Sequence, residues 1–367
     1  MPSALFSPFP LRGVTLPNRI VVSPMCQYVA EDGSATDWHL MHLGQLAMGA
    51  AGLLFTEATA VSAEGRITHG CLGLYSDANE AALGRVVQFC RRHGVAVLGI
   101  QLAHAGRKGS ARTPLAGGTA LAEGERPWTT LAPSALPYGP GWHTPQAMGA
   151  AELAAVKGQF TEAAMRAARL GFDLVELHMA HGYLLHQFLS PISNRRDDQY
   201  GGASESRMRY PLEVFESVRA ALPPGTALGV RVSATDWVEG GWTPAETVAL
   251  AKRLKALGCD FVDVSSGGLD PRQKVPLGPG YQVPFAAQVK RESGIPTMAV
   301  GLITEAEQAE GIVVAGDADL VALGRAIMDD PRWAWRAAAA LGADTPYASQ
   351  YVRAHPKFWP GARRKAA

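Results

Sequence analysis

The pattern that decides the fold is clearest in Leu170-Gly171-Phe172-Asp173-Leu174-Val175-Glu176-Leu177. A glycine just past a helix end terminates the helix, and the apolar run after it predicts a short strand that is buried on both faces. This strand leads directly into His178-Met179-Ala180-His181-Gly182-Tyr183. Imidazoles and phenols donate hydrogen bonds and can move protons, so two imidazoles and a phenol at a strand end indicate an active site.

The same pattern of a glycine followed by a short apolar run recurs along the chain. It places expected strands at residues 53–56, 95–100, 261–264, 296–300 and 320–323, and two further apolar runs lie at 19–23 and 228–233. Apolar strands that alternate with helices are typical of a parallel sheet covered on both faces. Eight such units predict an α/β protein with a closed (β/α)8 barrel, the TIM barrel. A doubly wound sheet is the runner-up, but the glycine fingerprint GxGxxG is missing after the first strand.

Two segments depart from a minimal barrel. Residues 10–16 predict a small hairpin before the first strand, which we expect to close the bottom of the barrel. Residues 105–150, after the third strand, are rich in glycine and proline, and such a long loop is usually a lid or a binding loop. No boundary indicates a second domain, so we expect one barrel over residues 1–367 with a C-terminal extension at about 342–367.

Composition excludes several classes of protein. The chain of 367 residues is 47% hydrophobic and 18% charged, and its formal net charge is +1. Such a balance favours neither nucleic acid nor an anionic membrane surface as a partner. We expect no secretory signal at the start, and the weakly polar stretch 43–55 is too short to span a bilayer. The four cysteines lack metal-type or redox-type spacing, which favours a reduced, cytoplasmic compartment and no metal site.

The carboxyl ends of the expected strands carry a coherent set of polar and glycine-bearing segments. In an α/β barrel these ends form the catalytic rim. Gly301 follows the seventh strand, and Gly324 and Arg325 follow the eighth, where barrels commonly bind phosphate through bare backbone N–H groups. Arg325 adds a bidentate donor for such a phosphate, and an ordinary ion pair at the barrel rim is the alternative.

Several motifs that occur together and in order resemble one family. They are Pro24-Met25-Cys26-Gln27-Tyr28, Glu57-Ala58-Thr59-Ala60, Gln101-Leu102-Ala103-His104-Ala105-Gly106-Arg107-Lys108, residues 178–191, Tyr200-Gly201-Gly202, Arg231-Val232-Ser233 and Gly324-Arg325. This set resembles the old yellow enzyme family of FMN-dependent ene-reductases, in its bacterial subgroup with a cysteine near the flavin, the thermophilic-like or xenobiotic-reductase type. The resemblance covers residues 5 to 353.

The resemblance implies a non-covalent FMN. In that pattern Gln101 holds the flavin pyrimidine edge, and Arg231 faces the N1–O2 side, where a cation stabilises the anionic reduced flavin. The Cys26 thiol lies near the flavin O4 and N5 atoms, where a polarisable weak donor adjusts the reduction potential. The backbone contacts to the ring come from Ser23, Pro24, Met25 and Ala58, and the phosphate lies at Gly301, Gly324 and Arg325.

The resemblance also implies the chemistry, in which NADPH or NADH reduces FMN and the flavin then reduces an activated C=C bond. His178 and His181 donate to the oxygen of an enone, an enal or a nitro compound, flavin N5 delivers hydride to Cβ, and Tyr183 delivers a proton to Cα. Tyr28 lines the substrate pocket and Lys108 lies nearby. Taken alone, the spacing of the two histidines also fits a structural pair or a metal site.

Other implications concern the neighbouring subunit and the competing functions. In this subgroup a chain end like Gln350-Tyr351-Val352-Arg353 reaches into a neighbour's site, so we expect a homo-oligomer, a dimer or tetramer, with Arg353 near substrate. Related enzymes can place a tryptophan at the position of Val300, which alters the pocket. The alternatives are a metal-dependent barrel hydrolase and a flavin-binding protein without physiological turnover. An iron–sulfur dienoyl thioester reductase is disfavoured because no cysteine follows Cys259.

Overall fold

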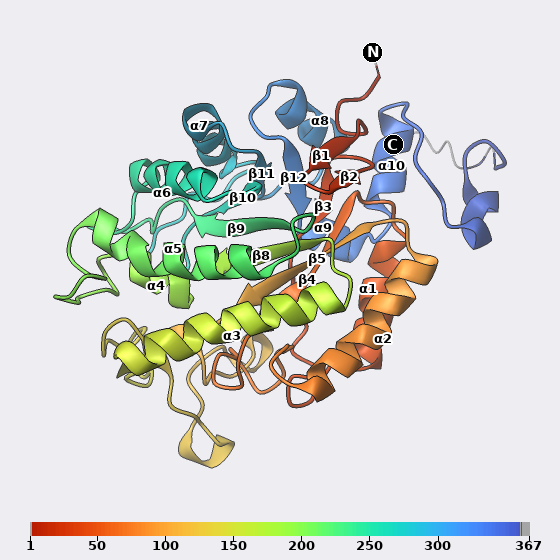
Figure 1. The fold of residues 1–367 in the computed structure, drawn as a ribbon. Coiled ribbons are helices and arrows are strands. Elements are labelled where there is room, and N and C mark those ends of the chain that lie inside the picture. Colours follow the sequence, from red (N-terminus) through yellow and green to blue (C-terminus); the bar gives the residue numbers. More distant parts are fainter. Residues whose placement is uncertain (1, 360, 362–367) are drawn as a thin grey trace.

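Eight parallel strands close into a barrel at the centre of the molecule (Figure 1). The computed structural model describes residues 2–359 and 361. Each strand pairs in parallel with the next one in the ring, and the last pairs with the first. In ring order the strands are β3 (Ile20–Val22), β4 (Leu53–Ala60), β5 (Val97–Ala103), β8 (Leu174–Met179), β9 (Ala227–Ser233), β10 (Phe261–Ser265), β11 (Thr297–Ala299) and β12 (Leu320–Leu323).

Helices surround the barrel and confirm the predicted (β/α)8 architecture (Figure 1). They are α1 (Asp37–Ala47), α2 (Asp77–His93), α3 (Ala150–Arg169), α4 (Leu184–Leu189), α5 (Ser204–Ala221), α6 (Pro244–Ala256), α7 (Val283–Ser293), α8 (Ala306–Val314), α9 (Arg325–Asp329) and α10 (Trp333–Ala340). Within the described part of the chain, no helix combines the length and the apolar character needed to cross a membrane.

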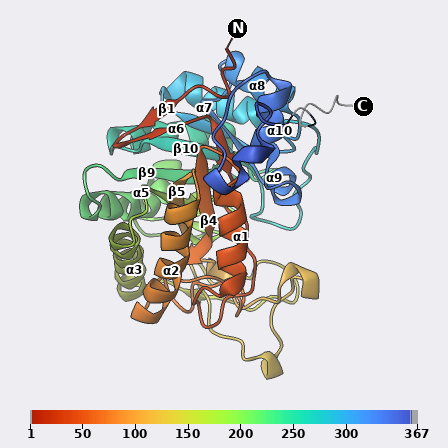
Figure 2. The same ribbon diagram turned by 90° about the vertical axis from the view of Figure 1, so that its right-hand side faces the viewer.

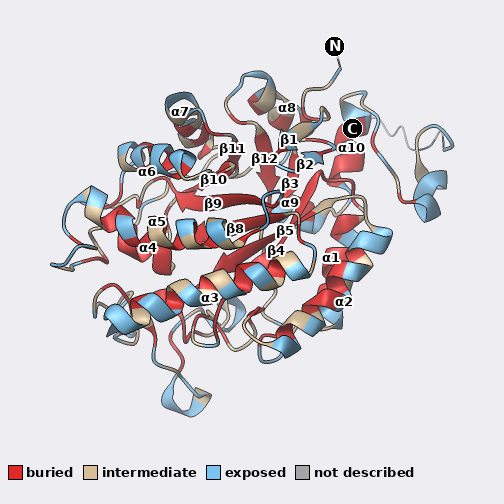
Figure 3. Ribbon diagram, viewed as in Figure 1, coloured by how far each residue is buried: buried red, intermediate tan, exposed pale blue. Residues whose placement is uncertain are grey.

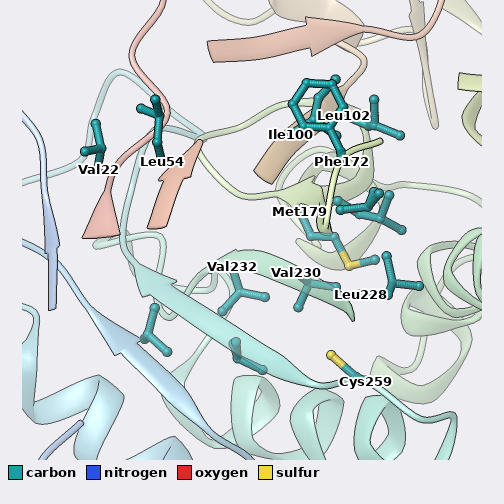
Figure 4. Close-up of a cluster of buried hydrophobic side chains, with 14 of the residues drawn as sticks. Val22, Leu54, Ile100, Leu102, Phe172, Met179, Leu228, Val230, Val232 and Cys259 are labelled. Carbon is teal, nitrogen blue, oxygen red and sulfur yellow. The ribbon is translucent and has the colours of Figure 1, made fainter. Parts of the chain in front are cut away.

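The core lies between the strands and the inner faces of the helices. Nearly every strand residue is buried, whereas the helices are buried along one stripe and exposed along the other (Figure 3). Figure 4 shows part of this apolar layer, with Val22, Leu54, Leu102 and Val230 contributed by four different strands. This layer fixes the strands rigidly, and rigid strands hold the side chains at their carboxyl ends in place.

The predicted N-terminal hairpin forms and covers the amino-terminal end of the barrel. Strand β1 (Phe9–Leu11) pairs antiparallel with β2 (Val14–Leu16). Leu11 and Leu16 are buried in a second apolar cluster with Phe55, Phe261 and other residues inside the barrel. This cluster excludes water from one end, so the opposite end is the open rim where a site can form.

The glycine pattern that predicted the strands holds only in part. Gly171 (φ 85°) and Gly258 (φ 84°) have the left-handed conformation expected after a helix. Gly94 does not, because it ends α2 with a φ of −89°. A Cβ atom at Gly94 would lie 2.6 Å from the Ala47 Cβ atom, so close packing against α1 explains that glycine. The prediction of a left-handed residue was therefore wrong at Gly94 and also at Gly52, which lacks a positive φ, although the strand after each was right.

The insertion after β5 lies at the rim, and Figures 1 and 2 show it at the end of the molecule opposite the hairpin. It contains short 3₁₀ turns and a two-residue parallel pair, β6 (Leu131–Ala132) with β7 (Gln146–Ala147). Arg107 anchors it, because its guanidinium donates to the carbonyl oxygens of Leu136 and Pro137 in the loop and of Leu269 after β10. The loop therefore belongs to the walls of the rim.

Candidate active site

Four side chains from neighbouring strands form a polar layer inside the open end of the barrel. Gln101 on β5 lies opposite Glu176 on β8, and Arg231 on β9 lies opposite Asp263 on β10. The Gln101 Nε2 atom donates to Glu176 Oε1 over 2.7 Å, and the Arg231 Nε atom lies 3.1 Å from Asp263 Oδ2. The structure thus brings Gln101 and Arg231, both predicted to contact a cofactor, into one buried layer with two acids.

His178 on β8 lies opposite Arg231 on β9 and has a defined protonation state. The Ala180 backbone N–H donates to its Nδ1 atom over 3.1 Å, so Nδ1 is an acceptor and carries no proton. Burial first, and then the Arg231 cation, hold the pKa of His178 well below its usual value. The ring is therefore neutral with its proton on Nε2, which makes Nε2 a hydrogen-bond donor.

His181 is held in a strained conformation by its neighbours. Its φ is 57°, in the left-handed region that is unfavourable for residues other than glycine. Its backbone N–H donates to Ser233 Oγ over 3.0 Å, and its carbonyl oxygen accepts from Lys108 Nζ over 2.8 Å. These two contacts hold the turn that brings the His181 and His178 rings to a centroid separation of 5.1 Å, nearly perpendicular to each other.

The tautomer of the His181 ring depends on its contact with a serine hydroxyl. The Nε2 atom lies 2.7 Å from Ser265 Oγ. When the serine hydroxyl donates to Nε2, the proton of the neutral ring lies on Nδ1, which can then donate to a ligand. Burial first, followed by the Arg231 cation, lowers the pKa of His181 well below its usual value, so the ring is neutral.

Tyr183 follows the histidines and begins a short helix. It is the N-cap residue of α4, and its ring is perpendicular to that of His178 with centroids 4.9 Å apart. Burial raises the pKa of Tyr183 well above its usual value, which keeps the phenol protonated. The turn before it is fixed by His186, whose Nδ1 atom accepts from the Gly182 N–H over 2.9 Å and whose Nε2 atom lies 2.9 Å from Asp236.

Lys108 connects the histidine turn to the neighbouring loop that follows β10. Its Nζ atom donates to the carbonyl oxygens of His181 and Gly268, each over 2.8 Å. The same nitrogen lies 5.2 Å from the centroid of the Tyr183 ring and 4.7 Å from that of Tyr138. Burial first, and then the neighbouring Arg107 cation, lower the pKa of Lys108 to about 7. The amine therefore changes charge near neutral pH.

Cys26 and Tyr28 lie at the end of β3, on the other side of the rim. The Tyr28 hydroxyl and the Cys26 thiol lie close enough to influence each other's pKa. Burial first, and then the Glu57 carboxylate, raise the pKa of Cys26, so it is a thiol and not a thiolate. Before it come Ser23, which is buried, and Pro24 and Met25, which are partly buried; Ala58 on β4 is also buried.

The predicted phosphate residues lie where β11 and β12 end, and these two strands pair. Gly301 has a φ of 124°, and a Cβ atom there would lie 2.8 Å from Gln282 Nε2, so only glycine fits. Arg325 is exposed and begins α9 directly after Gly324. Val300 lies just before Gly301, is partly buried and packs against the apolar cluster inside the barrel.

Arg353 is not placed with the other predicted residues. It lies on the 3₁₀ helix η4 (Ser349–Ala354) and is exposed. This segment packs on α10 through Tyr351, whose ring centroid lies 6.2 Å from that of Trp335. Figure 1 shows the segment, in dark blue, on the outside of α10. A role for Arg353 within its own subunit therefore has no support from its position.

Sequence reasoning missed several residues that shape the site. Glu176 and Asp263 were treated as parts of apolar strands, although an acid in such a run is itself a signal of an internal polar site. The contacts of Ser233, Ser265 and Lys108 with the histidine turn depend on how separate loops meet, and no sequence spacing indicates these contacts. No group of three or more His, Cys, Asp or Glu side chains that could hold a metal occurs among the described residues.

Comparison with known proteins identifies similar sequences over nearly the whole chain. Residues 4–343 match the NADH:flavin oxidoreductase / NADH oxidase family. The NADPH dehydrogenase of Geobacillus thermodenitrificans is 44% identical over 355 residues, which cover 96% of this chain and 99% of that protein. The NADPH dehydrogenase of Listeria innocua is 45% identical over 354 residues, with coverage of 96% and 99%.

Solved structures share the architecture. Morphinone reductase in complex with tetrahydroNAD superposes with a TM-score of 0.77 at 28% identity, over 94% of this chain and 92% of that chain. A 2-naphthoyl-CoA reductase superposes with a TM-score of 0.82 at 22% identity, over 93% of this chain and 52% of that chain. The second likeness supports the fold alone.

Proposed function

Since the chain belongs to the NADH:flavin oxidoreductase / NADH oxidase family, the old yellow enzymes, and is an FMN enzyme with NAD(P)H as reductant, we propose that it reduces the activated C=C bond of enones, enals and nitroalkenes. The observation that carries the proposal is the neutral His178, whose Nε2–H is a donor, next to the protonated phenol of Tyr183. Together they offer a hydrogen bond for an oxygen and a proton for a carbon.

The residues at the rim fit FMN. The Ser23 Oγ atom is buried and has no hydrogen-bond partner within the described ranges, and the buried Arg231 is a cation. Gln101 donates one N–H to Glu176, which leaves its Oε1 atom and its other N–H for a second partner. This donor and acceptor set suits the pyrimidine edge of a flavin, and Gly301, Gly324 and Arg325 suit its phosphate. Bound FMN supplies the hydride chemistry, which it takes from NAD(P)H and passes to an electron-poor carbon.

His178 and His181 would bind the oxygen of the electron-withdrawing group. The hydrogen bond from His178 Nε2–H strengthens as negative charge develops on that oxygen, so it lowers the barrier more than it tightens ground-state binding. When the Ser265 hydroxyl donates to His181 Nε2, the His181 Nδ1–H is a second donor for the same oxygen. Both rings are neutral because they are buried near Arg231, and they therefore stabilise charge without giving up their own protons.

Tyr183 would donate the proton to the α carbon. Loss of that proton creates a phenolate, and the Lys108 ammonium 5.2 Å from the ring centroid would stabilise the negative charge. Cys26 and Tyr28 would contact the bound molecules from the opposite side. Because burial keeps Tyr183 protonated at neutral pH, the donor is ready before each turnover.

The function is tested by following NADPH consumption and product formation without oxygen. We expect 2-cyclohexenone to be converted to cyclohexanone with one NADPH consumed per ketone formed. A matched assay with cyclohexanone in place of the enone should consume no NADPH, because the activated double bond is absent. FMN-loaded protein that oxidises no NADPH in the presence of an enone, an enal or a nitroalkene would instead support a flavin-binding protein without such turnover.

A further inference from the structure

The polar layer under the rim contains more negative than positive groups. Glu176 is 0% exposed and Asp263 is 1% exposed, and the one cation between them is Arg231, which is 7% exposed. Asp263 lies 3.1 Å from the Arg231 Nε atom, whereas Glu176 accepts a hydrogen bond from the neutral amide of Gln101. Glu176 Oε2 and Asp263 Oδ1 have no hydrogen-bond partner in the described part of the chain.

Ionising both buried carboxylates beside one cation is energetically unfavourable. An ionised carboxylate loses much solvation energy on burial, and such a group binds a proton unless it is paired and hydrogen-bonded. Asp263 has the ion pair, so Glu176 is the member that holds a proton more readily. Its Oε1 atom already accepts from Gln101, which leaves Oε2 as the oxygen that can carry the proton.

The groups that face Glu176 support this assignment. Burial first, and then the Asp263 carboxylate, raise the pKa of Glu176 to about 8, against the lowering effect of Arg231 and Gln101. Gln101 faces it from β5, Arg231 from β9 and Asp263 from β10, and the Cys259 thiol before β10 is also within electrostatic reach. Burial likewise raises the pKa of Asp263, and Arg231 opposes that effect.

We propose that Glu176 is a proton-binding positioning residue, which, at an alkaline pH where it is ionised in the oxidised enzyme, takes up one proton from solvent when the bound FMN gains two electrons and a net negative charge. The side chain would act through Gln101, which it orients, and through Arg231, whose positive charge it shares. The inference rests on the FMN site and not on the proposed substrates. A neutral Glu176 leaves more of the Arg231 charge to stabilise the reduced cofactor.

The step balances in atoms and charge. NADPH transfers two electrons and one hydrogen as hydride to the cofactor and leaves as NADP⁺. Separately, a proton from water forms an O–H bond on Glu176 Oε2, and the carboxylate becomes a neutral acid. No redox change occurs on Glu176. Below pH 8 the acid is already protonated in the oxidised enzyme, so the extra proton uptake appears only when the pH rises above that value.

The test is a redox titration of the FMN-loaded enzyme at a series of pH values between about 6 and 10. For the parent we expect one proton per two electrons at low pH and close to two above pH 8. Glu176→Gln keeps the shape and the acceptor for Gln101, and it should show one proton per two electrons throughout. Glu213→Gln is the control: Glu213 is a partly exposed residue on α5, and this variant should take up protons as the parent does.

A second variant tests the role of the neighbouring acid. Asp263→Asn removes the charge that raises the proton affinity of Glu176. The pH above which the enzyme takes up close to two protons per two electrons should therefore fall. Infrared difference spectra of the parent enzyme at pH 9 test the same proposal without any variant. Reduction of the parent should produce a band of a protonated carboxylic acid.

Two results would overturn the inference. One is a parent enzyme that takes up one proton per two electrons at every pH and shows no carboxylic acid band. The other is a Glu176→Gln variant that still takes up close to two protons per two electrons above pH 8. Neither experiment contains an enone, so enzyme that fails to reduce enones but shows the extra proton would reject the proposed substrate class and leave the role of Glu176 in place.

Discussion

At the residue scale, the protonation states of the site follow from backbone contacts. The Ala180 N–H at 3.1 Å from His178 Nδ1 selects the tautomer with a proton on Nε2, and burial keeps that ring neutral. In the same way, Lys108 and Ser233 hold the left-handed turn at His181. The chemistry therefore depends on groups that touch no reacting atom, and their substitution should alter the pH dependence and the geometry of the site.

Lys108 gives the first prediction. Its pKa of about 7 lies below that of a normal lysine, so the amine is charged below pH 7 and loses its charge as the pH rises through that value. We expect the step that needs a proton from Tyr183 to slow as the pH rises through 7. Lys108→Met should slow the step on the order of 10-fold to 100-fold at pH 6 and flatten the profile.

The measurement is the rate of enone reduction by pre-reduced enzyme between pH 5.5 and 8.5. Lys108→Arg keeps a charge at every pH and serves as the control, so its profile should also be flat but at a higher rate. A Lys108→Met profile that still falls through pH 7 would assign the titration to another group.

The sequence predicted which residues form the site better than it predicted the contacts between them. His178, His181 and Tyr183 were found because a strand end rich in imidazoles and phenols is uncommon. The hydrogen bond between His181 and Ser265 was not predictable, because it joins the end of β8 to β10 across the intervening strand β9. Glu176 was overlooked because one acid in an apolar run was assigned to the strand instead of to a function.

At the scale of elements, the barrel strands place the site and the N-terminal hairpin closes its opposite end. Apolar runs predicted the strands, since parallel strands that are buried on both faces need apolar side chains on both faces. Their exact bounds were less predictable, as the short β3 shows: residues 19–23 were expected and Ile20–Val22 form the strand. The internal structure of the insertion was not predicted, because loop residues such as Arg107 are fixed by distant carbonyl groups.

The hairpin gives the second prediction. Leu16 is 0% exposed and packs in the cluster inside the barrel. Leu16→Ala should lower the free energy of unfolding by about 2–5 kcal/mol, because it removes buried surface and leaves a cavity. Urea unfolding followed by circular dichroism measures the change, and the exposed Leu115→Ala serves as a control with little effect. Equal stability of the two variants would remove the hairpin from the core.

At the scale of the whole molecule, apolar side chains are exposed on the C-terminal segment. The exposed fractions are 42% for Val352, 68% for Phe358 and 48% for Trp359. Such a patch is typical of an interface between subunits. The third prediction is that the chain forms a homo-oligomer through this segment and that Arg353 reaches the neighbouring subunit's site.

Sedimentation of the parent at micromolar concentration should give a dimer or larger species. Phe358→Glu should shift the protein to a smaller species, and Arg353→Ala should keep the parent's size while raising the KM for the enone. Leu277→Glu, at an exposed position between β10 and α7, is the control. A parent that sediments as a monomer with full activity would contradict this prediction.

The central claim is that Tyr183 protonates carbon, and Tyr183→Phe tests it most directly because only a hydroxyl is lost. Stopped-flow absorbance follows the two half-reactions of the FMN-loaded variant separately. We predict reduction by NADPH at close to the parent rate, and reoxidation by 2-cyclohexenone slower by about 10²–10⁴-fold, the usual contribution of a general acid. His178→Ala should instead weaken enone binding as well as slow reoxidation. Reoxidation of Tyr183→Phe at the parent rate would contradict the assignment of Tyr183 as the proton donor.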